Sequence, residues 1–415
     1  MGNFTSGLIV VAGIIVLVII SVATYTWVTM PPDLDPNSLP SRTLEEPSAN
    51  YEAAVKEGRS IARELIAEEK LPGLSLAVAV DGEIVWAEGF RFAHLENETP
   101  VTPETLFRIG GISQTFTAAA AGLLFDREQL SFDAPIQEYV SSFPEKRWPI
   151  TARQLMAHTS GLRPHRGEGG LFRGVCANDE ERLAIFAGDS LVYRPGTNFR
   201  YSSYGWMLVG AAVAAAADEP YLEFLKREIF EPLEMTRTEP DIAGQKIRGT
   251  AQFYYPRLML KPAWGLHEAS DVDFSCYLAA VGFLSTPSDL VRFGSAMMGD
   301  ELLNQTTVKT LQTPTQLESG ESTGQGLGWT VQSLATDPSQ EPTKILGQGL
   351  GKTVVGHTLG VGTVGGQVAG GTASLLTVPE HKIAIAVATN VTGSENASLI
   401  ATRLADTFVR FLQAN

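Results

Sequence analysis

The sequence predicts an α/β (α+β) fold in which strands from both ends of the chain form one body around an inserted, mostly helical block. Two apolar runs joined by Asp81-Gly82, Leu74 to Val80 and Ile84 to Ala87, have the pattern of a β-hairpin. Strand-like runs return only near the C-terminus, and the residues between them show helical periodicity. We therefore expect an α/β body made of residues 51–115 and 281–415, with a helical subdomain at 116–280.

The first 30 residues are expected to form a short tail and a transmembrane anchor. Gly7 to Met30 carry no charged side chain and exceed the roughly 20 residues that span a bilayer as a helix. A cleaved signal peptide would begin with basic residues and have a shorter apolar run. Tyr25 and Trp27 suit the membrane interface. The first basic residue is Arg42, so the positive-inside rule leaves the orientation of this lipid-contacting span open.

Residues 31–50 are rich in proline, serine and acidic side chains, which predicts an extended tether between the membrane and the domain. The domain then begins with a helix at Tyr51 to Glu69. The segment Ile150 to Leu162 is expected to be helical, with Thr151 as N-cap and Gly161 at its end. Further helices are predicted at Phe116–Phe125, Tyr204–Ala217, Tyr221–Ile229, Ser288–Met298 and Ala397–Leu412, and strands at Gly326–Gln332, Ser374–Val378 and Ile383–Thr389.

Composition excludes several classes of protein. The chain has 415 residues, of which 44% are hydrophobic, and a net charge of −15, so it can bury a large core and offers no basic patch for nucleic acid. The six histidines are scattered, and no metal-ligand spacing occurs, so we expect no metal and no cofactor. Of two readings for Cys176 and Cys276, two separate buried thiols is preferred over one disulfide.

Several stretches resemble the serine β-lactamase and penicillin-binding-protein superfamily, and within it the mitochondrial serine-β-lactamase-like proteins. They are P-G-L-S-L-A-V-A-V-D-G-E-I-V-W-A-E-G (72–89), T-P-E-T-L-F-R-I-G (102–110), A-H-T-S-G-L (157–162), R-Y-S-S-Y-G (200–205) and G-F-L-S-T-P-S-D-L-V-R-F-G-S-A-M (282–297). The resemblance covers about residues 51 to 412. It implies a β-lactamase/transpeptidase-like fold, with an antiparallel sheet flanked by helices.

The motifs that carry the chemistry of that superfamily are altered here. Its Ser-x-x-Lys places a nucleophile and a base on one face of a helix start. Gly111 and Gln114 stand at those two positions, and neither glycine nor an amide can do that work. The second motif corresponds to Tyr201-Ser202-Ser203. The third begins as His357-Thr358, but Leu359 replaces the expected glycine and begins a predicted insertion, Leu359 to Val364, that would block a substrate carboxylate.

The resemblance therefore implies a vestigial pocket without catalytic residues. Ser113 lies about 200° around the helix axis from position 111, so it is not expected to replace the nucleophile. His158 is expected to be a hydrogen-bonded structural histidine rather than a catalytic base. The pocket is predicted to be lined by Gly111, Gln114, Tyr201, Ser203, His357 and Thr358.

These features predict a membrane-anchored pseudoenzyme that acts as a structural or assembly subunit, with protein partners in a membrane complex or as a homo-oligomer. The resemblance implies the mitochondrial inner membrane. Five of the ten asparagines lie in N-x-Ser/Thr sequons, which would instead suit a secretory or cell-surface membrane. Two other functions stay open: a serine hydrolase or peptidase with a non-standard nucleophile, and a non-catalytic domain that binds a small ligand.

Overall fold

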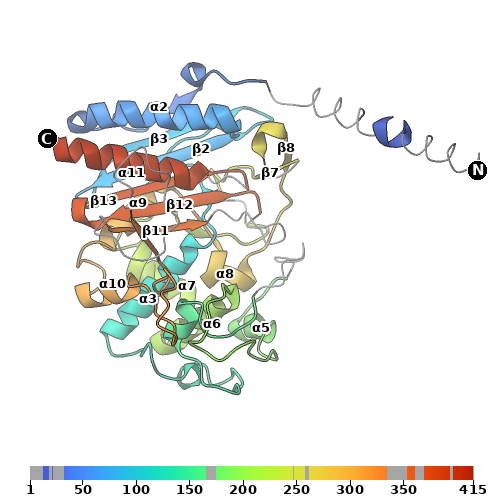
Figure 1. Cartoon of the computed structure of the whole chain (residues 1–415), viewed down its shortest axis with the longest axis vertical. Coiled ribbons are helices and arrows are strands. Elements are labelled where there is room, and N and C mark those ends of the chain that lie inside the picture. Colours follow the sequence, from blue (N-terminus) through green and yellow to red (C-terminus); the bar gives the residue numbers. More distant parts are fainter. Residues whose placement is uncertain are drawn as a thin grey trace, which may run out of the picture.

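One sheet of eight strands, built from both ends of the chain, organises the molecule (Figure 1). The computed structural model describes residues 13–17, 21, 32–164, 174–245, 247–257, 261–333, 353–359, 369–392 and 396–414. The strand order is β1-β3-β2-β13-β12-β11-β10, with β4 paired to β3, and every pair is antiparallel. The strands are β1 (Ser41–Arg42), β2 (Gly73–Val80), β3 (Glu83–His94), β4 (Thr99–Pro100), β10 (Thr330–Ser333), β11 (Thr353–Leu359), β12 (Thr372–Val378) and β13 (Ile383–Thr389). This architecture confirms the predicted α/β fold.

The two faces of the sheet carry side chains of different size. Leucine, isoleucine and valine from β2 and β13, such as Leu76 and Ile385, pack under α2 (Glu52–Glu69) and α11 (Asn396–Ala414). The alternate residues are alanines, such as Ala77 and Ala386, and they face α9 (Pro287–Ala296) and the helical layer. Because alanine is small, α9 can lie close to the strands on this face.

Gly294 of α9 marks the closest part of this contact. A Cβ atom at Gly294 would lie 3.0 Å from Cδ1 of Leu375 and 3.2 Å from Cβ of Ala384. We expect Gly294→Val to lower the free energy of unfolding by about 1–3 kcal/mol, because the added methyl groups overpack the interface. The matched control is Gly299→Val, where no atom lies closer than 3.8 Å to the built Cβ. Equal losses of stability in a denaturant titration of the two variants would contradict this account.

The helical layer surrounds α3 (Ile112–Asp126), which packs against α6 (Ser203–Ala217), α8 (Leu278–Val281) and α10 (Gln305–Leu311). Phe116 of α3 meets Phe230, Phe283 and Phe293 edge to face, with ring centroids 4.8–5.8 Å apart. The remaining helices are α4 (Ala152–Met156), α5 (Asp179–Ala184) and α7 (Tyr221–Leu225), which continues as a π-helical turn, Lys226–Phe230. Two small sheets complete the layer: β5 (Phe107–Arg108), β9 (Phe283–Ser285) and β6 (Glu239–Pro240), and the hairpin β7 (Tyr254–Pro256) with β8 (Leu266–Glu268).

Two predicted elements are shorter than expected. Thr151 caps α4 through a reciprocal bond with Gln154, as predicted, but the helix ends at Met156. His158 and Gly161 both have positive φ, 57° and 78°, which a continuing helix does not allow. The strand expected from Gly326 begins only at Thr330, since Gly328 has φ 88° and turns the chain. The predicted hairpin is confirmed, with Asp81 and Gly82 both at positive φ in its turn.

The segment of residues 32–50, called the strap below, is not the extended tether that the sequence predicted. It lies against α2 and β3, and Leu39 is only 6% exposed. Arg63 of α2 donates hydrogen bonds to the carbonyls of Pro36 and Asn37 and to the Ser41 hydroxyl. The prediction was wrong because a segment rich in proline and acidic residues has the composition of a solvated linker. The two residues of β1 and the single Leu39 are too few to reveal from the sequence that this segment packs on the domain.

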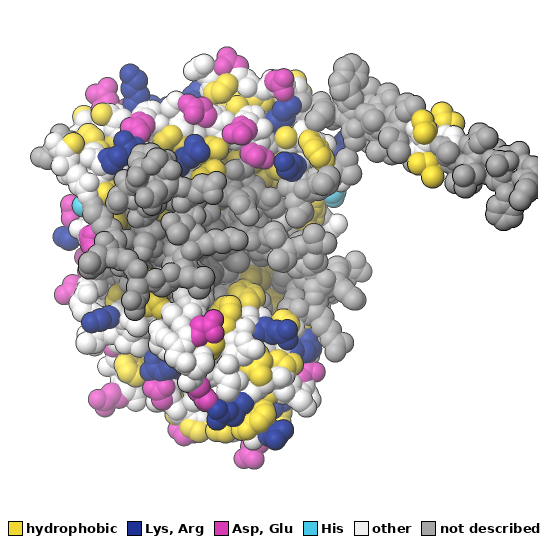
Figure 2. All heavy atoms as spheres, viewed as in Figure 1, with side chains coloured by type: hydrophobic (Ala, Val, Ile, Leu, Met, Phe, Trp, Pro, Cys, Tyr) yellow, Lys and Arg dark blue, Asp and Glu magenta, His cyan; other side chains and the backbone are white. Residues whose placement is uncertain are grey.

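Among the described residues, no helix is both long and apolar enough to cross a membrane. Most of the predicted span, Gly7 to Met30, lies outside the described residues, which include only 13–17 and 21 of it. On the face shown in Figure 2, acidic and basic side chains are interspersed over α2 rather than grouped by sign.

Candidate functional site

The site expected from the sequence lies where α3 begins. β5 leads into Gly110, which has φ 52°, and Gly111 is the N-cap of α3. The backbone N–H groups of Ser113 and Gln114 donate to the carbonyls of Gly110 and Gly111 (3.0 and 2.9 Å). The positive end of a helix dipole thus points toward position 111, but glycine places no reactive atom there.

Gln114 is fully buried in the first turn of α3, and its amide contacts Tyr201. Its Nε2 donates to the Tyr201 hydroxyl at 2.5 Å. The other amide atom, Oε1, is buried and has no hydrogen-bond partner among the described residues. The position of the expected base therefore holds a neutral side chain that is bonded to the tyrosine of the second motif.

Tyr201 lies over the site with its ring partly exposed and its hydroxyl turned inward. The residue is 40% exposed, mainly through its ring, given the hydroxyl's bond to Gln114. Burial of the hydroxyl raises the pKa of Tyr201, and side-chain hydrogen bonds with Ser203 and Gln114 partly offset that effect. Because a raised pKa keeps the phenol protonated, Tyr201 is a poor proton acceptor at neutral pH.

His158 is a structural support for Tyr201. Its ring lies tilted against the Tyr201 ring, with the centroids 4.5 Å apart, and meets the Phe199 ring edge to face, with the centroids 6.0 Å apart. Nδ1 accepts the backbone N–H of Ser202 (3.2 Å), and Nε2 lies 3.4 Å from the indole nitrogen of Trp206. Because Nδ1 is the acceptor, the neutral ring carries its proton on Nε2. A second proton at Nδ1 would break the bond from Ser202, so His158 is unsuited to act as a base. It is buried and hydrogen-bonded, as predicted.

Two serines near the site are already engaged. The Ser113 hydroxyl donates to the Gly110 carbonyl at 2.5 Å and is fully buried. Ser203, the first residue of α6, is 8% exposed and shares a hydrogen bond with the Tyr201 hydroxyl. Among the described residues, no lysine amine is bonded to either hydroxyl.

The third motif lies on β11, which borders α3. In the backbone register, His357 pairs with Leu375, Thr358 with Ser374 and Leu359 with Ala373. The side chains of His357 and Thr358 and the predicted insertion after Leu359 lie outside the described residues. The structure therefore brings Gly111, Gln114, Tyr201 and Ser203 together and places the backbone of the third motif beside them.

Arg108, which sequence analysis did not single out, anchors the start of α3. Its Nε donates to the Asp241 carboxylate at 2.7 Å, and Nη1 donates to the Ala369 carbonyl. The guanidinium lies over the rings of Phe253 and Phe274, 4.2 and 5.4 Å from their centroids. Burial raises the pKa of Asp241, and the charge of Arg108 opposes this rise. One arginine thus ties β5, β6 and the chain before β12 together just ahead of Gly111.

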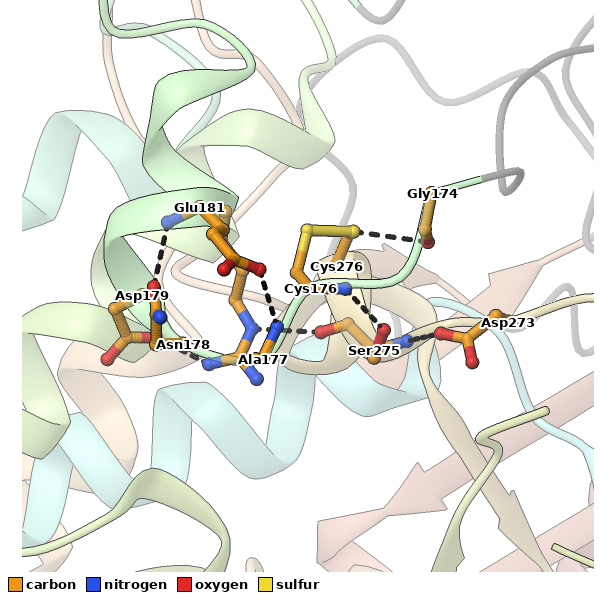
Figure 3. Close-up of a disulfide and its surroundings, with 10 residues drawn as sticks. Gly174, Cys176, Ala177, Asn178, Asp179, Glu181, Asp273, Ser275 and Cys276 are labelled. Carbon is orange, nitrogen blue, oxygen red and sulfur yellow. Dashed lines mark hydrogen bonds and ion pairs between the residues drawn. A yellow bond between two sulfur atoms is a disulfide. The ribbon is translucent and has the colours of Figure 1, made fainter. Parts of the chain in front are cut away.

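Cys176 and Cys276 form a disulfide, which corrects the prediction of two separate thiols (Figure 3). The Cys176 N–H donates to the Ser275 hydroxyl (2.9 Å), and Arg182 of α5 donates to the Ser275 carbonyl (2.8 Å). The bond joins the chain before α5 to the turn before α8. The two cysteines are 100 positions apart, so nothing near either one in the sequence indicates that they pair. The sequence showed only that the chain has two cysteines, which is enough for one disulfide.

The described residues contain no group of three or more His, Cys, Asp or Glu side chains that could hold a metal ion. A groove of about 610 Å³ lies away from the candidate site, between the N-terminal half of β3, the strap and the start of α9. None of the predicted pocket residues lines it.

The contact between Gln114 and Tyr201 can be tested through stability. We expect Tyr201→Phe to lower the free energy of unfolding by about 1–3 kcal/mol, because the buried amide of Gln114 loses its partner. In a Gln114→Leu background the same change should cost less, since only the Ser203 hydroxyl then loses a partner. Tyr255→Phe is the control, because the structure shows no hydrogen bond from the Tyr255 hydroxyl among the described residues. Equal costs in both backgrounds would show that the contact does not form.

Comparison with known proteins agrees with this geometry. The beta-lactamase family model matches residues 59–407. The human mitochondrial serine beta-lactamase-like protein LACTB is 29% identical over 321 residues, which cover 60% of this chain and 57% of that protein. Penicillin-binding protein 4* of Bacillus subtilis is 25% identical over 276 residues, 62% of this chain and 59% of that protein. The aligned part thus spans about three fifths of the length of these relatives.

Solved structures give the same assignment. The octameric penicillin-binding protein homologue from Pyrococcus abyssi is 26% identical with a TM-score of 0.68, covering 86% of this chain and 77% of that one. A class C beta-lactamase is 20% identical with a TM-score of 0.68, and the match covers 87% of this chain and 98% of that chain. This likeness shows a shared fold. The chain belongs to the beta-lactamase family.

Proposed function

We propose that this protein is a membrane-anchored member of the family that has lost catalysis and acts as a structural or assembly subunit. The observation that carries the proposal is the start of α3, where Gly111 and Gln114 stand at the positions of nucleophile and base. Losing both groups removes the covalent step itself and the proton transfer that assists it. The surrounding fold nevertheless keeps its buried core and its polar contacts.

The neighbouring side chains support loss of catalysis rather than replacement. The Ser113 hydroxyl is hydrogen-bonded to the Gly110 carbonyl, and the Ser203 hydroxyl is hydrogen-bonded to Tyr201. His158 faces N–H groups at both ring nitrogens. A hydrolase with a non-standard nucleophile would need one of these groups to leave its present partner.

We propose that the domain lies on the side of a membrane that faces an oxidising compartment. Disulfides persist in oxidising compartments, so the Cys176–Cys276 bond suits a domain outside the reducing cytosol. The relatives named mitochondrial favour a mitochondrial location. Within the mitochondrion, the proposed membrane is the inner one. The secretory alternative loses one of its sequons, because Asn390 is fully buried and donates to three backbone carbonyls.

Two measurements test this function. The native protein should not react with a fluorophosphonate serine probe, and covalent labelling would overturn the loss of catalysis. After gentle solubilisation of the native membrane, the chain should migrate in a complex much larger than its own 44.6 kDa. Migration as a single chain with detergent would overturn the role as an assembly subunit.

A second candidate, binding of a small ligand without turnover, is favoured by the buried Oε1 of Gln114. A buried acceptor without a partner is costly, and a ligand donor would satisfy it. Mass spectrometry of small molecules released from the purified native protein tests this. A compound present in the wild type and absent from Gln114→Leu would support binding, and no such difference would exclude it.

A further inference from the structure

The strap fixes the place where the chain leaves the domain. Asp33 forms an ion pair with Lys70 at the end of α2 (2.9 Å). Farther along, the Arg91 N–H donates to the Pro40 carbonyl (2.8 Å), and the Ser48 N–H donates to the Val85 carbonyl (2.9 Å). Figure 1 shows the strap lying along α2 before the chain continues toward the N-terminus. The strap therefore behaves as part of the domain from residue 32 onward.

Little chain is left between the strap and the predicted span. The apolar run ends at Met30, and Pro32 is the first described residue of the strap. Since an extended chain covers at most about 3.6 Å per residue, these two residues are separated by about 7 Å or less. If Gly7 to Met30 crosses a bilayer, the surface around Asp33 must lie close to the lipid headgroups.

The β7–β8 hairpin shares this end of the molecule with the strap. Its connecting turn, Pro262–Trp264, contacts α2. Arg257 and Lys261 are exposed, Trp264 is half-buried, and its indole N–H has no acceptor among the described residues. Tyr255 stacks on His267, with ring centroids 5.6 Å apart. Tryptophan, tyrosine and long cationic side chains are the residue types that suit a membrane interface.

We propose that the strap holds one surface of the domain against the bilayer, and that this membrane-facing surface consists of Tyr255, Arg257, Lys261, Trp264 and His267. The occupant is the lipid headgroup layer around the span. The inference rests on the membrane anchor of the proposed function and adds which face of the domain meets the lipid. It also implies that α10, which packs on α3 in the helical layer, lies away from the membrane.

Fluorescence quenching in reconstituted vesicles tests the arrangement. The full chain is placed in phosphatidylcholine vesicles that contain a lipid with a nitroxide on its headgroup. Because the native cysteines form a disulfide, His267→Cys and Lys309→Cys each introduce a single thiol for a fluorophore. Lys309 lies on α10 and is the matched distal position. We expect several-fold stronger quenching at position 267 than at position 309.

The role of the strap is tested by lengthening the connection. Twenty Gly/Ser residues inserted between Pro31 and Pro32 add a root-mean-square reach of about 25 Å and should remove most quenching at position 267. Quenching that persists would overturn the role of the strap, and equal quenching at both positions would overturn the proposed surface. A chain that fails to float with the vesicles would instead overturn the membrane anchor, so failure of the proposed function is recognised separately.

Discussion

The double variant Gly111→Ser/Gln114→Lys is expected to react covalently with a small fluorophosphonate probe, whereas wild type should stay unlabelled. It should react at least about 100-fold faster than Gly111→Ser alone, the low end of what a positioned base contributes. Position 111 is the N-cap of α3, where serine is among the preferred residues, so the change should not disturb the helix. Position 114 lies one turn along the same face. The introduced hydroxyl would attack phosphorus, displace fluoride and pass its proton to the introduced amine.

The contacts around Gln114 favour this result. Its amide lies 2.5 Å from the Tyr201 hydroxyl, so a lysine amine at position 114 can take over the same hydrogen bond. The helix N-terminus would favour the charge that develops on the oxygen atoms of the probe. A small probe is chosen because the insertion predicted at Leu359 to Val364 would block larger substrates.

Two controls separate the groups. Gly111→Ala/Gln114→Lys lacks the nucleophile and should stay unlabelled. Gly111→Ser alone should react about 100- to 10,000-fold more slowly than the double variant, because no base is present. If the double variant melts like wild type and yet stays unlabelled, the site has lost more than these two groups, and the scaffold is no longer built for acyl transfer. Labelling of all four proteins at one rate would point to a different serine.

Local patterns in the sequence predicted the parts of this fold that depend on near neighbours. The hairpin followed from Asp81-Gly82 between two apolar runs, and the structure has this turn with both residues at positive φ. The cap at Thr151 was also predicted, and the structure shows it as a reciprocal bond with Gln154. The end of that helix was missed, because the positive φ of His158 is set by contacts with Ser202 and Tyr193, more than 30 residues away in the sequence.

The candidate site was located by motif positions, but its chemistry depends on contacts between distant parts of the chain. Nothing near Gln114 in the sequence shows that Tyr201 lies 2.5 Å away. Arg108 looked like an ordinary strand residue, and only the fold places Asp241, Phe253 and Phe274 around it. Docking of the strap was missed for the same reason, because its partners are Arg63, Lys70 and β3.

Removal of the disulfide with Cys176→Ala/Cys276→Ala is expected to lower the free energy of unfolding by about 2–5 kcal/mol, because the bond closes a loop of 100 residues. That is a large share of the roughly 5–15 kcal/mol that stabilises a typical domain. Both cysteines are buried, at 7% and 2% exposure, so the bond forms part of the packing between α5 and the turn before α8. Denaturant unfolding of wild type and variant in oxidising buffer measures the difference.

Reductant provides the matched comparison, because it removes the bond without changing the sequence. Wild type should lose a similar amount of stability in a reducing buffer, whereas the alanine variant should not respond.

The same bond also reports orientation: if thiol alkylation in intact cells finds Cys176 and Cys276 protected, the domain faces an oxidising compartment, and the span must be oriented to place it there. Free thiols in the cell, or a wild type that is indifferent to reductant, would show that the native domain does not depend on this bond. The redox state of these two residues would therefore report the orientation of the predicted span, which the flanking charges leave open.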